Sequence, residues 1–320
     1  MLNFRDRTKD TMRVTAQISA KSAIAQQRYW YWRGWRIHYQ VVPALSPQQD
    51  LPPILLLHGF GASLAQWRDN VAELAQQRTV YAVDLLGFGD SQKAATIFNT
   101  ELWSAQVHDF WQTWIGQPVI LMGHSLGALV ALNTAVSTPA MVERLVLLTL
   151  PAAREELLSG WLESVSRGAE RLFSTPLLIR PIFQIFRRSG VIRGALRSVY
   201  QRRDRVDDAL VRQFVKPTEE RGAARTLCYL VRSRTEIQFT PATKHLVPRL
   251  TMPTLLLWGQ ADRVIPLTWG QQLAPLNPLL TLQVLPNLGH CAYDEEPALI
   301  NQQILNWLKA APTLPHAEGA

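Results

Sequence analysis

A serine between two glycines is the residue of this chain best suited to covalent chemistry. Ser125 is the central residue of a Gly-His-Ser-Leu-Gly motif at 123–127, which follows the apolar run 118–122 and precedes the helix-compatible stretch 128–135. A serine on a sharp turn between a strand and a helix is a nucleophile elbow. Glycines are needed on both sides because larger side chains would collide with the neighbouring strand and helix. Ser125 is therefore the candidate nucleophile.

A serine hydroxyl is a poor nucleophile, so the chain must also supply a general base and an acid that orients it. The best base is His290, on a loop after the strand-like segment 281–285. The best acid is Asp262, which follows the apolar run 255–258 and a turn that contains glycine. The order serine, aspartate, histidine is the order that the elbow motif requires, and it differs from the trypsin-like and subtilisin-like orders. The residues predict a Ser125, His290, Asp262 triad.

Negative charge that develops on a substrate oxygen needs two backbone donors. The first is the amide of Leu126, the residue after the nucleophile. The second is the amide of Phe60, in the His-Gly-Phe-Gly segment 58–61 directly after the apolar strand 54–57. Glycines in that segment let the backbone turn back over the site. We therefore predict an oxyanion hole formed by Phe60 and Leu126, while the substrate-binding residues stay unknown.

Other polar residues near these motifs are explained by structural roles. His58 follows the first strand of the core rather than the last, so we expect it to support the oxyanion loop. Asp84 ends a strand and precedes two glycines, so we expect it to orient a loop by accepting backbone amides. His124 is expected to point away from Ser125 and to pack. The acidic run 294–296 is expected to cap the last helix.

Cysteine and glycine patterns argue against metal and cofactor chemistry. Cys228 and Cys291 cannot form a disulfide framework, and no Cys/His cluster has metal-ligand spacing. Gly87 and Gly89 are too close together for a dinucleotide fingerprint, and the chain has no phosphate-binding loop motif. We expect neither metal nor cofactor, and we interpret Cys291 as a small buried hydrophobe.

The pattern of strands and helices that positions these residues is that of an α/β protein. With 320 residues, 47% of them hydrophobic, the chain can bury one large core. Residues 29–42 predict an opening antiparallel hairpin that turns at Arg33 and Gly34. The alternation that follows predicts a mostly parallel central sheet with helices on both faces. We expect strands at 54–57, 79–84, 119–123 and 145–150, helices near 63–77 and 99–115 and after Ser125, and two final strands that carry the acid and the base.

The alternation stops after Pro151 and resumes at Thr254, which divides the chain. We expect an α/β core at 29–150 and 249–310, with a helical cap inserted at 151–248. Ligands of such sheets bind outside the carboxyl ends of the strands, so the cap should cover Ser125. Residues 1–28 are predicted to be a basic N-terminal extension, and residues 311–320 a flexible tail.

The cap carries most of the formal net charge of +8. From 178 to 205 it has eight arginines against the single acid Asp204, a local charge of +7. Apolar residues lie between these arginines, a pattern that suits an anionic membrane surface; the alternative is a solvated helical face that packs its apolar side on the core. Nucleic-acid binding is disfavoured because no recognised motif accompanies the charge. The arginines are Arg180, Arg187, Arg188, Arg193, Arg197, Arg202, Arg203 and Arg205.

The chain has no apolar stretch typical of export or membrane spanning. Residues 1–28 lack the apolar run of a secretory signal, and no run of about 18 to 20 apolar residues occurs elsewhere. We predict a cytoplasmic protein, with peripheral membrane contact through the cap as an open alternative.

Taken together, the motifs resemble those of the α/β-hydrolase superfamily over about residues 29–310. They are the segments 58–61, 84–91 and 123–127, together with Asp262 and Gly289-His290. The resemblance implies the α/β-hydrolase fold and a serine nucleophile, whereas an aspartate at 125 would have implied a dehalogenase or an epoxide hydrolase. Weaker similarity at 30–35, 59–63, 198–200 and 206–210 resembles the cyanobacterial and plastid branch that includes chlorophyll dephytylases and pheophytinases, which implies a long-chain or phytyl-type ester.

We therefore predict a cofactor-independent serine hydrolase that cleaves a hydrophobic small-molecule carboxylic ester through an acyl-enzyme. A carbon-carbon bond hydrolase or a thioesterase would use the same triad and stays an alternative. A non-catalytic binding protein of the same fold is a second alternative.

Overall fold

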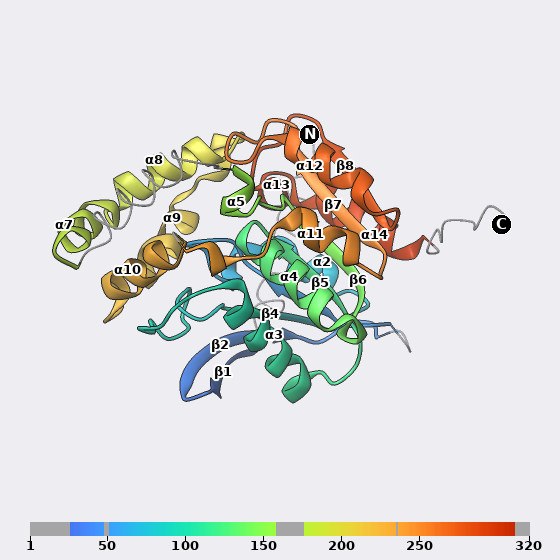
Figure 1. Ribbon diagram of the computed structural model, residues 1–320, viewed down its shortest axis with the longest axis horizontal. Helices are drawn as coiled ribbons and strands as arrows, with labels where there is room; N and C mark the ends of the chain where they lie inside the picture. Colours follow the sequence, from blue (N-terminus) through green and yellow to red (C-terminus); the bar gives the residue numbers. More distant parts are fainter. Residues whose placement is uncertain (1–25, 48–50, 158–175, 235, 311–320) are drawn as a thin grey trace, which may run out of the picture.

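An eight-stranded sheet forms the centre of the computed structural model, which describes residues 26–47, 51–157, 176–234 and 236–310 (Figure 1). The strand order is β1-β2-β4-β3-β5-β6-β7-β8. β2 pairs antiparallel with β1 and β4, and the remaining pairs are parallel, so the expected mostly parallel sheet is confirmed. The strands are β1 (Gln26–Trp32), β2 (Trp35–Val42), β3 (Ile54–Leu57), β4 (Val80–Val83), β5 (Val119–His124), β6 (Val142–Leu148), β7 (Thr254–Gly259) and β8 (Leu280–Leu285).

The opening hairpin turns where the sequence predicts it. Trp32 pairs with Trp35, and the two residues between them, Arg33 and Gly34, have φ values of 50° and 83°. Two successive left-handed residues give a turn whose twist matches that of the flanking strands. Nearly all of the predicted N-terminal extension, residues 1–25, lies outside the described residues, as does the predicted tail 311–320.

Apolar side chains on both faces of the parallel strands explain why helices cover the sheet on two sides. In β3, Leu55 and Leu57 belong to one buried cluster, and Ile54 and Leu56 belong to another. The first cluster includes residues of α3 (Thr100–Trp114) and α4 (Leu126–Ser137), and the second includes residues of α2 (Val71–Leu74) and α14 (Pro297–Lys309). The expectation of helices on both faces is confirmed.

The continuous helix expected near 63–77 is wrong. The structure has a 3-10 helix, η1 (Leu64–Trp67), and then the short α2. Between them, Asn70 Nδ2 donates to the Tyr293 carbonyl at 3.1 Å and to Asn301 Oδ1 at 2.9 Å. These hydrogen bonds to distant residues hold Asn70 at the point where the helix is interrupted. Asparagine side chains also form local hydrogen bonds that compete with those of a helix backbone.

The described residues between β6 and β7 form helices joined by loops, and they contain no strand. In Figure 1, α7 to α10 lie together to one side of the sheet. This segment comprises α5 (Arg154–Leu157), α7 (Pro176–Phe186), α8 (Ser189–Val199), η3 (Arg203–Arg205), α9 (Asp208–Val215), η4 (Lys216–Glu219), α10 (Ala223–Arg234), η5 (Ile237–Phe239), α11 (Thr243–Leu246) and η6 (Val247–Arg249).

The remaining helices are η2 (Pro139–Met141) between α4 and β6, and three elements around the last two strands: α12 (Leu267–Leu273), η7 (Ala274–Leu276) and α13 (Ala292–Glu295). Within the described residues, no helix is both long enough and apolar enough to cross a membrane.

Candidate active site

Ser125 occupies a strained turn between β5 and α4. Its φ of 52° and ψ of −116° lie in a region that residues with a side chain rarely adopt. A Cβ at Gly123 would lie 2.2 Å from the Gly127 carbonyl oxygen, and a Cβ at Gly127 would lie 2.4 Å from the Leu57 carbonyl oxygen. The steric reason that the sequence suggests for both glycines is confirmed.

Asp262 and His290 lie at the carboxyl ends of the adjacent strands β7 and β8. His290 Nδ1–H donates to Asp262 Oδ2 at 2.8 Å. The other carboxylate oxygen, Oδ1, accepts the Val264 amide at 2.7 Å and the Ile265 amide at 2.9 Å. Both carboxylate oxygens of Asp262 thus accept hydrogen bonds, which fixes the carboxylate against His290. They also leave the Nε2 lone pair of His290 available for a proton.

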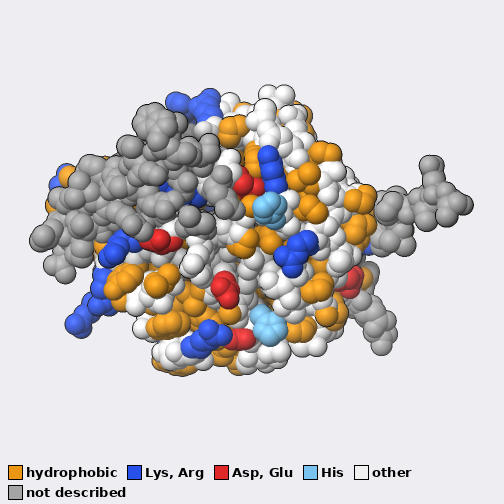
Figure 2. Space-filling model, viewed as in Figure 1, with side chains coloured by type: hydrophobic (Ala, Val, Ile, Leu, Met, Phe, Trp, Pro, Cys, Tyr) orange, Lys and Arg blue, Asp and Glu red, His pale blue; other side chains and the backbone are white. Residues whose placement is uncertain are grey.

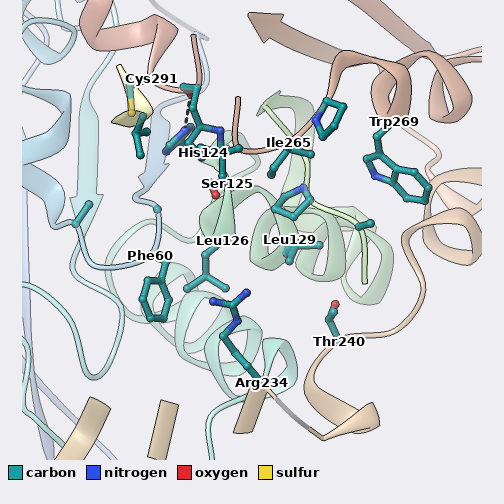
Figure 3. Close-up of a pocket in the computed structure, with 18 of the residues that line it drawn as sticks. Phe60, His124, Ser125, Leu126, Leu129, Arg234, Thr240, Ile265, Trp269 and Cys291 are labelled. Carbon is teal, nitrogen blue, oxygen red and sulfur yellow. Dashed lines mark hydrogen bonds between the residues drawn. The ribbon is translucent and has the colours of Figure 1, made fainter. Parts of the chain in front are cut away.

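Ser125 and His290 line the same cavity, whose volume is about 690 Å³ (Figure 3). Within the described residues, no hydrogen bond joins Ser125 Oγ to His290. Catalytic hydrogen bonds are often long without substrate and shorten when it binds. Asp262 does not line the cavity, and it contacts His290 through the Nδ1 side of the imidazole. The structure thus brings the predicted acid and base into direct contact, and places the base and the nucleophile at one cavity.

Phe60 and Leu126 also line this cavity. In the described part of the chain, neither backbone amide donates to a protein acceptor. Leu126 is the first residue of α4, where amides have no partner within the helix. Both residues therefore line the cavity with backbone amides that have no protein acceptor in the described part of the chain.

His58 holds the loop that carries Phe60. Its Nδ1–H donates to the Gly59 carbonyl at 2.8 Å, and its Nε2 accepts the Leu85 amide at 3.0 Å. Complete burial lowers the pKa of His58, and the two bonds fix one neutral tautomer. The structural role predicted for His58 is confirmed.

Asp84 joins three segments below the site. Its carboxylate accepts the Leu64 amide at 2.6 Å, the Asp90 amide at 2.8 Å and His38 Nδ1–H at 2.7 Å. Burial acts to raise the pKa of Asp84, but the hydrogen bond from His38 and the proximity of His58 outweigh it and lower the pKa. The predicted role in orienting loops is confirmed.

Two polar residues support the site in ways that the sequence does not reveal. Gln66 Oε1 accepts the Gly59 amide at 3.1 Å, and His124 Nε2–H donates to the His290 carbonyl at 2.9 Å. The sequence interpretation of His124 as a packing residue is incomplete, because the side chain also positions the His290 backbone. The sequence gives only a weak indication of the role of Gln66, which is that a polar residue lies among the apolar residues of η1. Gln66 Nε2 and His124 Nδ1 are buried and have no hydrogen-bond partner among the described residues.

The expectation that residues 294–296 cap the last helix is wrong. Asp294 binds Arg68 and Arg205 at 3.0 Å each and accepts the Tyr200 hydroxyl at 2.8 Å. Glu295 accepts the backbone amides of Gly289 and Arg202, while Glu296 at the N-cap of α14 makes no capping bond. Tertiary partners thus tie the segment after His290 to the inserted helices.

The cavity lining is mainly apolar and comes from both the core and the inserted segment. Leu196, Val199 and Phe214 line it from α8 and α9. Cys291 lines it too and is buried, and burial raises the pKa of its thiol, which agrees with the interpretation as a small hydrophobe. Among the residues that the structure describes, no group of three or more His, Cys, Asp or Glu could hold a metal ion.

A family model described as "Alpha/beta hydrolase family" matches residues 54–303. "Uncharacterized hydrolase YugF" of Bacillus subtilis (strain 168) is 25% identical over 262 residues, which cover 80% of this chain and 89% of that protein. "Pheophytinase, chloroplastic" of Arabidopsis thaliana is 24% identical and covers 86% of this chain and 64% of its own length. "2-hydroxy-6-oxo-6-(2'-aminophenyl)hexa-2,4-dienoic acid hydrolase" of Metapseudomonas resinovorans is 24% identical, with 83% and 87% covered.

Solved structures of other proteins share the fold, and two of them show how closely. A membrane phospholipase A described as a bacterial virulence factor superposes with a TM-score of 0.72 at 23% identity, covering 93% of this chain and 91% of that one. The epoxide hydrolase CorEH superposes with a TM-score of 0.73 at 21% identity, covering 89% and 98%. At 23% and 21% identity, these superpositions show that the fold is shared and nothing further.

Proposed function

This chain belongs to the alpha/beta hydrolase family, and from that premise we propose that it is a cofactor-independent serine hydrolase that cleaves a carboxylic ester in a hydrophobic molecule. The observation that carries the proposal is the contact of His290 with Asp262 at the cavity that also holds Ser125. The α/β-hydrolase fold itself, with its mostly parallel sheet, agrees with the expectation from the motifs.

The proposed reaction has two proton-balanced steps. Ser125 Oγ attacks the ester carbonyl carbon while His290 Nε2 takes the hydroxyl proton, and His290 then gives that proton to the departing alcohol. In the second step His290 takes a proton from water, the hydroxide attacks the acyl-serine, and the proton returns to Ser125 as the acid leaves. Asp262 holds the imidazole in the tautomer that both steps need.

The amides of Phe60 and Leu126 are proposed to stabilise the oxyanion in each step. Loss of one such donor typically costs on the order of a hundredfold to a thousandfold in rate. A serine at 125 favours ester chemistry over the epoxide chemistry of CorEH, because the superfamily resemblance associates epoxide opening with an aspartate at that position.

The apolar lining supports a hydrophobic substrate. The similarity to a pheophytinase keeps a phytyl-type ester among the candidates, and the similarity to a dienoic acid hydrolase keeps carbon-carbon bond cleavage as the alternative. Thioester cleavage and a non-catalytic binding role also stay alternatives.

The reaction class is tested by measuring kcat/KM for 4-nitrophenyl esters from acetate to palmitate, for acyl-thioesters of the same chain lengths, and for a dienoic carbon-carbon substrate. The proposal predicts the highest values for esters, with a rise toward longer chains. Faster cleavage of the thioesters or of the dienoic acid would replace the ester assignment with that alternative.

We further propose that the turn between α7 and α8 contacts an anionic membrane surface, and we call Ile185, Phe186, Arg187 and Arg188 the α7–α8 corner. The Ile185 and Phe186 residues are 51% and 60% exposed, and the exposed Arg188 follows them. Apolar side chains beside cations suit an anionic lipid surface. A cytoplasmic protein in peripheral contact with a membrane remains our proposal for the location.

The rest of the arginine-rich stretch is less available to lipid, because acids of the protein already pair with three of its members. Arg193 pairs with Asp208, Arg202 with Asp204 and Glu296, and Arg205 with Asp69 and Asp294. The local charge of the sequence therefore overstates the charge offered to a partner.

A further inference from the structure

A buried carboxylate lies five residues after the candidate base His290. Charged side chains are expected at the surface of a protein, and Figure 2 shows acidic and basic side chains scattered over the described part of the face that it draws. Glu295, the last residue of α13, is instead only 1% exposed. A carboxylate in such a place has to be held by hydrogen bonds, so its donors indicate its role.

The donors to Glu295 come from two parts of the chain that are far apart in the sequence. Its Oε2 accepts the Gly289 amide at 3.2 Å, and the same oxygen accepts the Arg202 amide at 3.1 Å. Gly289 directly precedes His290, whereas Arg202 belongs to the segment inserted between β6 and β7. One carboxylate oxygen therefore joins the loop of the base to the inserted segment.

The packing around Gly289 is close on both sides of this junction. A Cβ at Gly289 would lie 2.7 Å from Glu295 Oε1 and 3.0 Å from the Gln201 amide nitrogen. The loop, the carboxylate and the inserted segment are thus in direct contact. Because side chains in such an interior fill the space between backbones, loss of the carboxylate would leave room for the loop to shift.

The backbone around His290 is held at two points. On one side Glu295 binds the Gly289 amide, and on the other His124 Nε2–H donates to the His290 carbonyl at 2.9 Å. The imidazole is held separately, by its bond to Asp262. Precise placement of a general base matters, because a displacement of about 1 Å can cost roughly a hundredfold in rate.

We propose that Glu295 is a positioning residue for the general base, which holds the loop of His290 against the inserted segment. It does so by accepting the Gly289 and Arg202 amides at one oxygen. This role rests on the proposed ester hydrolysis and adds no chemical step to it. Glu295 does not line the cavity, and its part is to keep His290 Nε2 where it can take the proton of Ser125.

Three substitutions separate the position of the acceptor oxygen from its charge. Glu295→Ala removes both, and Glu295→Gln keeps an acceptor oxygen at the same place without the charge. Glu295→Asp keeps the charge on a side chain that is shorter by one methylene, which draws the carboxylate away from the two amides. Burial raises the pKa of Glu295, so its surroundings favour an uncharged acceptor and should tolerate the glutamine.

The measurements are kcat and KM for 4-nitrophenyl butyrate, together with the rate and the endpoint of fluorophosphonate labelling. The endpoint counts the intact sites, so kcat per labelled site is independent of any unfolded fraction. We expect Glu295→Ala and Glu295→Asp to lower kcat and the labelling rate by about tenfold to a hundredfold, with KM nearly unchanged. Glu295→Gln should stay close to the parent.

Glu296→Ala is the matched control. It removes the same charge from the next residue, whose partly exposed carboxylate pairs with the side chain of Arg202. The kcat of this variant should equal that of the parent.

Parent-like kcat per labelled site in both Glu295→Ala and Glu295→Asp would overturn the positioning role. A Glu295→Gln variant as slow as Glu295→Ala would overturn it too, because the charge of the side chain would then matter rather than the place of its oxygen. If Glu295→Ala does not fold, the other two variants decide, and Glu295→Gln must be faster than Glu295→Asp. A parent that neither cleaves esters nor reacts with the fluorophosphonate would instead refute the proposed function, so the two failures are distinguishable.

Discussion

Asp262 and His290 are joined by a 2.8 Å hydrogen bond although 28 residues separate them in the sequence. The bond forms because the strands that precede them, β7 and β8, are parallel neighbours and end at the same edge of the sheet. Both oxygens of the carboxylate are occupied by donors, so the orientation of the imidazole is fixed on its Nδ1 side.

Asp262→Asn tests this relationship. An amide at this position can offer an N–H toward His290 Nδ1, which would favour the wrong tautomer of the imidazole. We expect kcat for ester hydrolysis to fall by about a thousandfold to ten-thousandfold with the fold retained. Steady-state kinetics with circular dichroism checks this, and a kcat within a few-fold of the parent would show that Asp262 does not orient the base.

Gly127→Ala tests the steric basis of the elbow. Its Cβ would lie 2.4 Å from the Leu57 carbonyl oxygen, and overpacking of this kind costs about 1 to 3 kcal/mol or more. We expect a lower free energy of unfolding in urea and a loss of ester hydrolysis. Gly190→Ala in α8, where a Cβ would meet nothing within 4 Å, is the control and should be neutral or stabilising by up to about 1 kcal/mol. Equal stability of the two variants would contradict the account.

Stability should fall as the pH drops below about 6.5. Burial lowers the pKa of His58 from its ordinary value of 6.5. Below that pH, His58 is therefore protonated in the unfolded chain but still neutral in the folded chain. The stabilisation is complete above 6.5 and is lost toward the lower folded-state pKa. Urea unfolding between pH 8 and 5 measures the slope, and His58→Gln should make it shallower. An identical slope in His58→Gln would exclude His58 as its source.

Membrane contact should depend on the α7–α8 corner. We expect the protein to sediment with phosphatidylglycerol vesicles at low salt and much less at high salt, because cations near lipid contribute about 1 kcal/mol each. Replacing both Ile185 and Phe186 by serine should weaken binding by tenfold or more, since each buried side chain contributes about 1.5 to 3 kcal/mol. Ile97→Ser, at a residue 72% exposed outside the corner, is the control. No sedimentation of the parent, or equal binding by the double variant, would refute the contact.

The sequence predicted those parts of the protein that depend on local pattern. The elbow could be predicted because it needs two glycines within five residues. The parallel strands could be predicted because both of their faces are covered, which makes them apolar runs in the sequence. The hairpin was visible because Arg33 and Gly34 interrupt aromatic and β-branched residues.

Features that depend on distant partners were missed. The expected helix near 63–77 breaks where Asn70 bonds to residues more than 220 positions away. The acidic run 294–296 was interpreted as a helix cap because it directly precedes the last helix. Its observed partners include Arg68 and Arg205, which lie in two remote segments and cannot be identified from the sequence. Gln66 accepts a single hydrogen bond from the Gly59 amide in the oxyanion loop, and no sequence pattern predicts this bond.

Fluorophosphonate labelling of the purified protein shows whether Ser125 is a nucleophile that His290 activates. We expect one label per chain in the parent and no label in Ser125→Ala, with labelling slowed by about a thousandfold or more in His290→Ala. The folded state of each variant is checked by its thermal unfolding. Absence of labelling in a folded parent, or labelling that survives in Ser125→Ala, would show that Ser125 is not the activated nucleophile.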